Sequence, residues 1–234
     1  MRTLGLIGGI SWESTAVYYR RLNQIARERL GGHHSADLVM VSVDFAPIAA
    51  MQAAGEWDKA AGVMISAAER LAMAGAEAML ICANTMHRMA EDVQASVAIP
   101  VIHIADVSAA AMAAAGVSRP LLLATRYTME QPFYRDRLRQ GGVSATIPPA
   151  VARERVHAII YDELVQGLIE PASRAAVVAI VNAAVVEDGI DGVILGCTEL
   201  GLLVEPADLP VLTFDTTELH AQAAMDFALG GSAG

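Results

Sequence analysis

The chain has 234 residues, a hydrophobic content of 54% and a formal net charge of −10 at pH 7. The negative charge argues against a nucleic-acid partner, because affinity for phosphate backbones comes mainly from cationic side chains. No run of about 18 or more uncharged apolar residues occurs, and the N-terminus reads as a strand followed by glycines rather than as a signal peptide. These features predict a soluble, cytoplasmic protein whose partner is a small molecule, with no nucleic acid and no membrane involved.

The small numbers of cysteine and lysine residues argue against a zinc site and against pyridoxal phosphate as a cofactor. The chain holds two cysteines, Cys82 and Cys197, without the Cys and His spacing of a zinc site or a disulfide framework. A pyridoxal enzyme needs a lysine for its Schiff base, and the single lysine, Lys59, is predicted in a loop away from any strand end. The opening Gly5–Gly9 lacks the full dinucleotide spacing GxGxxG. No cofactor and no metal are therefore expected.

Strand and helix patterns alternate along the whole chain. The predicted strands are residues 4–7, 37–43, 78–82, 101–104, 121–124, 145–147, 192–195 and a last strand near residue 211. The predicted helices are residues 13–30, with Ser11 or Ser14 as cap, and residues 57–74, 85–96, 133–139, 152–166, 171–187 and 217–229. This alternation is typical of parallel sheets flanked by helices, so an α/β fold is predicted.

Two stretches, residues 74–85 and 188–199, repeat one pattern with Ala83 aligned to Cys197. Each reads as an apolar strand followed by small polar residues and a helix, and such strand ends present reactive groups in parallel sheets. A fainter echo relates residues 4–11 to residues 121–128. The repeats predict two pseudo-symmetric lobes, residues 1–102 plus 209–234 and residues 103–208. The cleft between them would have a thiol on one wall and a methyl group on the other.

The two cysteines receive different predictions. Cys197 is expected where a strand ends and a helix begins, where the helix dipole favours the thiolate; a buried structural cysteine is the alternative. Cys82 aligns with Gly196, and adjacent strand residues point to opposite faces, so Cys82 is expected to face the core.

Hydroxyl and amide side chains follow the predicted strand ends of both copies. These residue types commonly cap helices, and in an open cleft they also seat a carboxylate. The candidates for that second role are Ser11, Asn84, Thr85, Thr125, Thr128 and Thr198. His87 is expected at the surface or in the core, and His103, Asp106 and His157 are further cleft candidates without an assigned role.

Several segments resemble the aspartate/glutamate racemase family, which racemises amino acids without pyridoxal phosphate. They are GLIGGISWEST, CANTMH, TRYTMEQPFYRDRL, IIYDEL, LGCTELGLLV and FDTTELH. The resemblance implies a homodimer of two-lobed subunits with the active site between the lobes. It also implies that one thiolate removes the α-proton while a thiol on the opposite face donates one. By motif, Cys197 is the second of these cysteines, and Ala83 stands where the first is expected.

The resemblance therefore implies a racemase for aspartate, glutamate or related amino acids that is impaired at one of its two acid/base positions. Three explanations of Ala83 stay open: a water or another side chain replaces the thiol, the alanine is an engineered substitution, or the chain performs one-sided chemistry as single-cysteine decarboxylases do. A catalytically silent amino-acid binding protein is the alternative from another class. Residues 43–52 contain no cation for a distal carboxylate, which leaves Arg126, Arg20 or backbone amides for that task.

Overall fold

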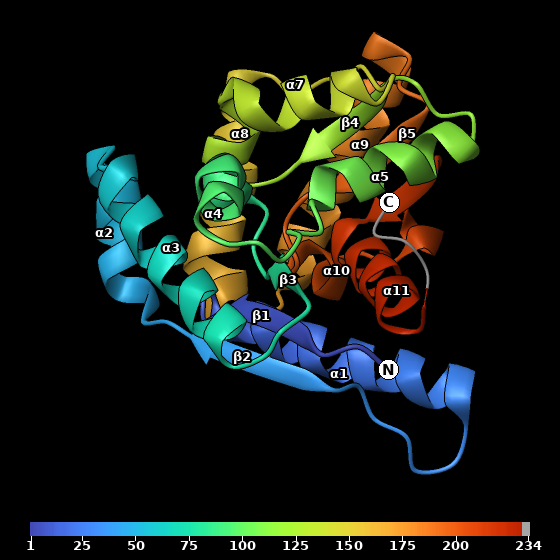
Figure 1. Cartoon of the computed structure of the whole chain (residues 1–234). Helices are drawn as coiled ribbons and strands as arrows, with labels where there is room; N and C mark the ends of the chain where they lie inside the picture. The colour runs from blue at the N-terminus through green and yellow to red at the C-terminus, as the bar shows by residue number, and fades with distance from the viewer. Residues whose placement is uncertain (231–234) are drawn as a thin grey trace. The chain divides into compact units, whose positions relative to one another are not determined.

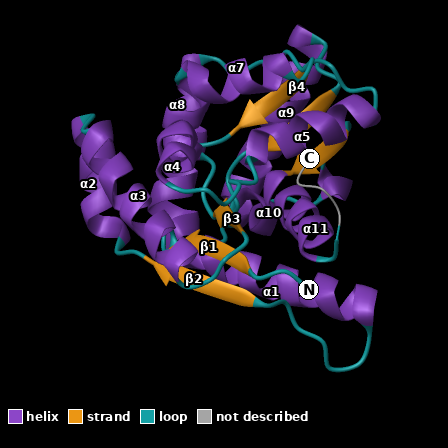
Figure 2. Cartoon of the chain, viewed as in Figure 1, coloured by secondary structure: helices purple, strands orange, loops and turns teal. Residues whose placement is uncertain are grey.

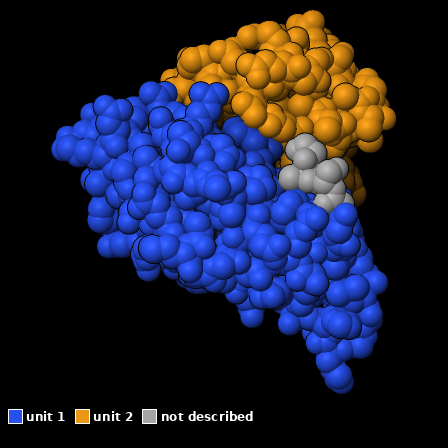
Figure 3. Space-filling model, in the orientation of Figure 1, with its two compact units in different colours: residues 1–104, 220–234 blue, residues 105–219 orange. Residues whose placement is uncertain are grey.

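The structure of the protein, a computed structural model, describes residues 1–230 (Figure 1). The chain forms two compact units, unit 1 with residues 1–104 and the described residues from 220 onward, and unit 2 with residues 105–219 (Figure 3). The predicted lobe boundaries lay after residues 102 and 208. The chain leaves unit 2 later than predicted because the last strand pairs with a strand of that unit.

Unit 1 contains a three-stranded parallel sheet of order β2-β1-β3. The strands are β1 (Leu4–Gly8), β2 (Leu38–Ser42) and β3 (Ala78–Ile81). The helices are α1 (Trp12–Leu30), α2 (Phe45–Ala54), α3 (Trp57–Met73), the 3-10 helix η1 (Thr85–Met89) and α4 (Ala90–Ser96). Val101 adds one parallel bridge to Met79, where the sequence predicted a strand over residues 101–104.

Both faces of this sheet are covered by helices. Ile7, Met79 and Ile81 share a buried cluster with the inner side of α3, which includes Met64 and Leu71. The side chains that alternate with them along the strands point to the opposite face. There α1 contacts β1, and its inner residues Tyr18, Leu22 and Ile25 are fully buried.

Unit 2 contains a second three-stranded parallel sheet, of order β4-β5-β6. The strands are β4 (Pro120–Leu123), β5 (Gly192–Leu195) and β6 (Leu212–Asp215). Its main helices are α6 (Arg126–Glu130), α7 (Pro132–Gln140), α8 (Ala150–Ala158), α9 (Pro171–Asp188) and α10 (Leu200–Leu203). Short helices η2 (Ile159–Glu163), η3 (Leu164–Gln166) and η4 (Pro206–Asp208) join them, and η2 is a π-helical turn. Every residue of β4 and β5 is buried, as expected of apolar parallel strands covered on both faces.

Two helices cross the boundaries of the units along the chain: α5 (Ile104–Ala114) begins in unit 1, and α11 (Thr216–Ala228) begins in unit 2. The predicted α/β fold with two parallel sheets flanked by helices is confirmed (Figure 2). The sequence missed α2 and α5 and predicted one continuous helix over residues 152–166, where the structure has α8, η2 and η3. Within residues 1–230, no helix is both long and apolar enough to cross a membrane.

The turn after β1 depends on two glycines. Gly9 has a φ of 91°, in the left-handed region that favours glycine, and its N–H donates to Thr15 Oγ1 at 2.8 Å. A Cβ at Gly8 would lie 2.8 Å from the same Oγ1 and closer still to the methyl group of Thr15. The hydroxyl of Thr15 also donates to Ser11 O at 3.0 Å, so Thr15 has little freedom to move away.

We therefore expect Gly8→Ala to destabilise the protein by ~1–3 kcal/mol through overpacking. Gly62→Ala is the matched control, because Gly62 lies inside α3 with nothing within 4 Å of an added Cβ. That control should raise stability by ~0.5–1 kcal/mol through helix propensity. Thermal unfolding of both variants checks the pair, and equal unfolding midpoints would contradict the packing argument.

Candidate active site

The carboxyl ends of β4 and β5 lie at one edge of the sheet of unit 2. Leu123 pairs with Leu195 at the ends of the strands, and Gly196 N–H donates to Leu123 O at 2.7 Å. Thr125 therefore follows one strand, and Cys197 and Thr198 follow its neighbour, at the same edge. This is the position at which parallel sheets present functional groups.

Cys197, Thr198 and Glu199 form a hydrogen-bonded group directly after β5. The Cys197 thiol donates to Glu199 Oε2 at 3.0 Å, and the Thr198 hydroxyl donates to the same oxygen at 2.6 Å. Glu199 is 3% exposed, whereas Cys197 is partly exposed. The sequence predicted that Thr198 and Glu199 cap a helix, but Glu199 makes no side-chain capping bond. Its carboxylate is directed at the thiol instead, and the sequence analysis gave Glu199 no chemical role.

The surroundings of Cys197 favour the neutral thiol. Burial raises the pKa of Cys197 well above its ordinary value, and the Glu199 carboxylate raises this pKa further. The prediction that a helix dipole favours the thiolate is wrong here. The helix that follows, α10, has only four residues, and desolvation and the adjacent negative charge outweigh its effect.

Asp215, at the end of β6, is a second carboxylate that raises the pKa of Cys197. Its Oδ1 accepts the backbone N–H groups of Thr217 at 2.8 Å and Glu218 at 3.2 Å in the first turn of α11. Burial raises the pKa of Asp215 itself. A Cβ at Gly201 would lie 2.6 Å from Asp215 Oδ2, so glycine is needed for the close approach of α10. The sequence gave no signal for Asp215 beyond its place in the motif FDTTELH.

Thr125 caps α6 as predicted, since its hydroxyl accepts Thr128 N–H at 3.4 Å. The neighbouring Arg126 N–H donates to His157 Nδ1 at 3.4 Å. The ring centroid of His157 lies 4.6 Å from that of Tyr161, which η2 carries. Burial and Arg126 lower the pKa of His157, whereas burial raises the pKa of Tyr161, with Tyr127, Cys197 and Glu199 adding to that effect. The aromatic side chains of Tyr127, His157 and Tyr161 thus extend from the end of β4 toward the Cys197 thiol.

In unit 1, the predicted site residues follow β1 and β3, which are neighbours in their sheet. Ser11, Asn84 and Thr85 are all buried. Ser11 precedes α1 and Asn84 precedes η1, but neither side chain makes the predicted capping bond. Cys82 is 1% exposed, which confirms its predicted core position, and burial strongly raises its pKa.

Ala83 is 8% exposed, and its carbonyl accepts a hydrogen bond from His87 Nδ1 at 2.9 Å. Because a carbonyl only accepts, Nδ1 carries the proton, and His87 Nε2 accepts Ile104 N–H at 3.3 Å. His87 is therefore a buried core histidine, one of the two positions that the sequence predicted. Its ring centroid lies 4.8 Å from that of His103.

His220, from α11, is fully buried, and its ring centroid lies 5.6 Å from that of His87. Its Nε2–H donates to Ile102 O at 2.7 Å, and its Nδ1 accepts the Tyr18 hydroxyl at 2.8 Å. Burial is the main cause that lowers the pKa of His220 to about 3, and nearby His87 adds to the effect. The imidazole is neutral at physiological pH.

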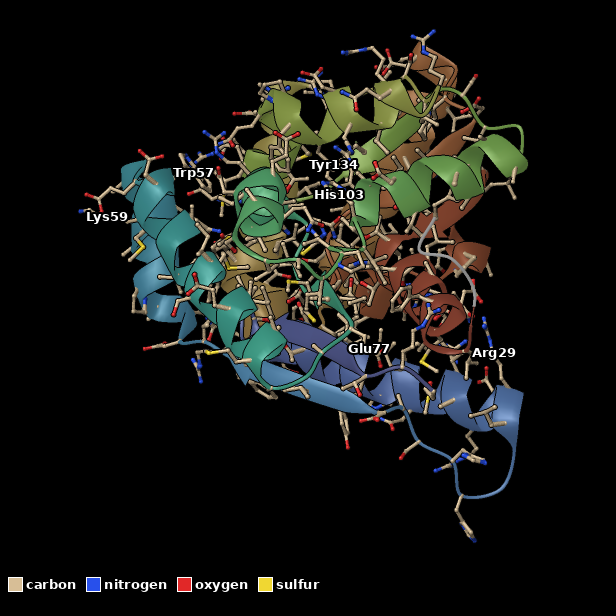
Figure 4. The ribbon with its side chains drawn as sticks, viewed as in Figure 1. Arg29, Trp57, Lys59, Glu77, His103 and Tyr134 are labelled. Carbon is tan, nitrogen blue, oxygen red and sulfur yellow. The ribbon has the colours of Figure 1, made fainter. Side chains whose placement is uncertain are left out.

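Lys59 lies in the first turn of α3 and forms an exposed ion pair with Glu56 at 2.7 Å (Figure 4). The sequence suggested both a loop around this residue and a helix over residues 57–74, and the structure places Lys59 in the helix. In the part of the chain that the structure describes, no group of three or more His, Cys, Asp or Glu side chains has the arrangement to hold a metal ion.

The family model of Asp/Glu/hydantoin racemases matches residues 7–224. The chain belongs to this family. A candidate Asp/Glu racemase from Yersinia pestis is 47% identical, with a TM-score of 0.90 over 98% of this chain and 100% of that one. An aspartate racemase homologue from Pyrococcus horikoshii OT3 is 34% identical, with a TM-score of 0.86 over 98% of this chain and 100% of the other. An aspartate racemase from Picrophilus torridus shares the fold at 18% identity, with a TM-score of 0.77 over 99% and 96%.

Membership of the racemase family confirms the resemblance seen in the motifs and does not test the site residues. The assignments of Cys197 and Ala83 to the two acid/base positions therefore stay predictions. The same holds for the six polar residues expected to seat a carboxylate, for the cleft between the lobes, and for the homodimer.

We predict that Glu199→Gln lowers the pKa of the Cys197 thiol. The substitution removes a negative charge that disfavours the thiolate, while burial keeps the pKa above its ordinary value. A Cys82→Ala background makes Cys197 the only thiol. Alkylation by iodoacetamide at neutral pH should then be faster than in that background alone. Glu187→Gln, an exposed change at the end of α9, is the control, and equal rates in both variants would remove Glu199 from its role.

We also predict acid-sensitive stability from His220. Its pKa is about 3 in the folded chain against an ordinary 6.5, so only the unfolded state takes up the proton as the pH falls between these values. The stabilisation is complete above pH 6.5 and is lost progressively down to about pH 3. Urea unfolding at several pH values in this window should show a shallower loss for His220→Gln than for the wild type. His33→Gln, in an exposed loop, should leave the loss unchanged. An equally steep loss in His220→Gln would contradict the assignment.

Proposed function

We propose that the chain is an amino-acid racemase that works without pyridoxal phosphate on aspartate, glutamate or related amino acids by thiol-mediated proton transfer at Cα. The observation that carries the proposal is the hydrogen bond from the Cys197 thiol to the buried Glu199 carboxylate after β5, in a chain of this family. Both similar proteins of higher identity bear names of the same racemase class.

The Cys197 and Glu199 pair supplies a base at the end of β5. Glu199 takes the thiol proton, and the thiolate that results removes the α-proton of the amino acid. The bonding electron pair stays on the α-carbon, where the α-carboxylate delocalises it. A raised thiol pKa makes the thiolate a stronger base once formed, which suits the removal of a weakly acidic proton.

The polar residues at both strand edges are the proposed contacts of the α-carboxylate. In unit 2 these are Thr125, Thr128 and Thr198, and in unit 1 Ser11, Asn84 and Thr85. The Thr125 hydroxyl accepts a hydrogen bond from Thr128 N–H, and the Thr198 hydroxyl donates one to Glu199. Both hydroxyls would therefore be oriented before the substrate binds. The homodimer and the cytoplasmic location are proposed on the family resemblance and on composition.

One feature favours a second candidate function, namely one-sided proton transfer. Ala83 presents only a methyl group where the family resemblance implies a thiol, and a methyl group neither gives nor takes a proton. If no other group replaces that thiol, Cys197 exchanges the α-proton of one enantiomer without inversion. A chain that shows neither exchange nor inversion would be a binding protein.

Proton exchange in heavy water separates these functions. L- and D-aspartate and L- and D-glutamate are incubated with the protein, and α-deuterium is followed by NMR while inversion is followed by chiral chromatography. We expect exchange that Cys197→Ser lowers by ~10²- to 10⁴-fold, the usual loss for an acid/base group.

Cys82→Ala is the matched control for this experiment, because it removes the other thiol from a core position. It should keep the wild-type rate of exchange. Wild-type exchange in Cys197→Ser would refute the assignment of Cys197, and the absence of exchange in the wild type with all four amino acids would refute the proposed function.

A further inference from the structure

The motif FDTTELH places a carboxylate near Cys197 to which the proposed function gives no role. Strand β6 pairs in parallel with β5, and Asp215 lies opposite Leu195 in that register. Cys197 is two residues beyond Leu195, at the edge of the sheet where both strands end. The Asp215 carboxylate is near enough to raise the pKa of the thiol, and both side chains are partly exposed. A ligand that reaches the thiol can therefore also reach Asp215.

Hydrogen bonds hold Asp215 in a fixed orientation at the start of α11. Its Oδ1 accepts the N–H groups of Thr217 at 2.8 Å and Glu218 at 3.2 Å. Both bonds go to the same oxygen, which leaves Oδ2 to a further donor. The Thr216 hydroxyl donates to Leu195 O at 2.9 Å and ties the first turn of α11 to β5. The carboxylate is thus oriented before a ligand binds.

The charged groups that act on Asp215 and on Cys197 are mainly carboxylates. Burial raises the pKa of Asp215, and the nearby Glu218 carboxylate adds to this effect. Burial likewise raises the pKa of Cys197, and Glu199 and Asp215 add to it. Negative groups that share a partly buried position repel one another. The position therefore favours a ligand that brings a positive charge.

The hydroxyl of Thr217 is an independent sign that a ligand binds here. Thr217 is 2% exposed, and its Oγ1 makes no hydrogen bond of normal geometry within residues 1–230. The side chain lies near enough to Asp215 to lower the pKa of that carboxyl. A buried hydroxyl without a hydrogen bond is costly and uncommon in native proteins. Its place beside Asp215 indicates that a ligand bound to the carboxylate completes the hydrogen bonds of this group.

The amino acids of the proposed function carry one cationic group, the α-ammonium. Its nitrogen is bonded to the α-carbon, the atom from which Cys197 would remove a proton. An acceptor for the ammonium must therefore lie close to the thiol, as Asp215 does. The three N–H groups of an ammonium suit carboxylate and hydroxyl oxygens. A carboxylate of the substrate would be repelled from the same position by Asp215.

We propose that Asp215 binds the α-ammonium group of the amino-acid substrate and that Thr217 supports this contact. The inference rests on the proposed function, because it takes the ligand beside Cys197 to be an amino acid. The contact also affects the thiol. The charge of the bound ammonium offsets that of Asp215, which is one of the causes that keep Cys197 neutral. The substrate thus favours the thiolate with which it reacts.

The test compares ligands that differ in the amino group alone. Isothermal titration calorimetry measures the affinity of the protein for L- and D-aspartate and for succinate, which lacks the ammonium, and likewise for glutamate and glutarate. Asp215→Asn removes the charge and keeps Oδ1 as the acceptor at the start of α11. We expect it to lower the affinity for the amino acids by ~10- to 100-fold, the usual loss for a hydrogen bond to a charged group. The affinity for succinate and glutarate should stay the same or rise.

Two further variants support the comparison. Asp188→Asn changes an exposed carboxylate at the end of α9 and is the matched control, so it should leave every affinity unchanged. Thr217→Val replaces the buried hydroxyl by a methyl group of similar shape. It should keep or raise the thermal unfolding midpoint, because the hydroxyl has no hydrogen-bond partner within residues 1–230. Its affinity for the amino acids should fall, by less than that of Asp215→Asn.

An unchanged affinity of Asp215→Asn for the amino acids would overturn the inference. An equal loss for aspartate and succinate would also overturn it, because Asp215 would then be structural. If Asp215→Asn does not fold, Thr217→Val decides alone, and wild-type affinity in that variant overturns the inference. Amino-acid binding that depends on Asp215, in a wild type without α-proton exchange, refutes the proposed function and supports the role of Asp215. A wild type that binds none of the amino acids overturns both.

Discussion

The proposed chemistry of this chain depends on the hydrogen bond from the Cys197 thiol to the Glu199 carboxylate. Burying a carboxylate is costly unless hydrogen bonds satisfy it, and the hydroxyl of Thr198 and the thiol donate to the same oxygen of Glu199. The same contact raises the pKa of the thiol and provides the group to which its proton can go. Burial and a single residue two positions after the cysteine thus both favour the neutral thiol, and in the proposed mechanism that residue also accepts the thiol proton.

The two copies of the internal repeat differ at two successive positions after the strand, where Cys82 aligns with Gly196 and Ala83 with Cys197. A Cβ at Gly196 would lie 2.8 Å from Leu122 Cδ1 and 3.1 Å from Ala124 Cβ, so packing in unit 2 requires glycine there. The aligned residue in unit 1 is Cys82, which fills a core position. The first of the two positions is therefore fixed by packing in each copy. The second, which is the predicted acid/base position, holds a thiol in one copy and a methyl group in the other.

Much of this architecture followed from the sequence, because apolar strands of four or five residues that alternate with amphipathic helices specify parallel sheets. The helix α2 was missed because its apolar residues do not recur on one face at helical spacing. The helix α5 was missed because its alanine-rich sequence does not form a distinct apolar face. The pKa direction of Cys197 was also missed, since it depends on burial and on where the Glu199 side chain points. Hydrogen-bond partners of this kind, and those of His87 and His220, come from tertiary contacts that residue spacing does not encode.

An asymmetric pair of proton-transfer groups has a defined kinetic consequence for a racemase. The two enantiomers have equal free energies in water, so their equilibrium constant is one and kcat/KM must be the same in both directions. Unequal groups on the two faces therefore act on kcat and KM together, by changing how the bound enantiomers and the resting protonation states are populated. In this chain the raised pKa of Cys197 favours the thiol at rest, the form that donates a proton. A thiol on one face and a group other than a thiol on the other would thus make the two directions differ in saturation behaviour while the overall reaction stays balanced.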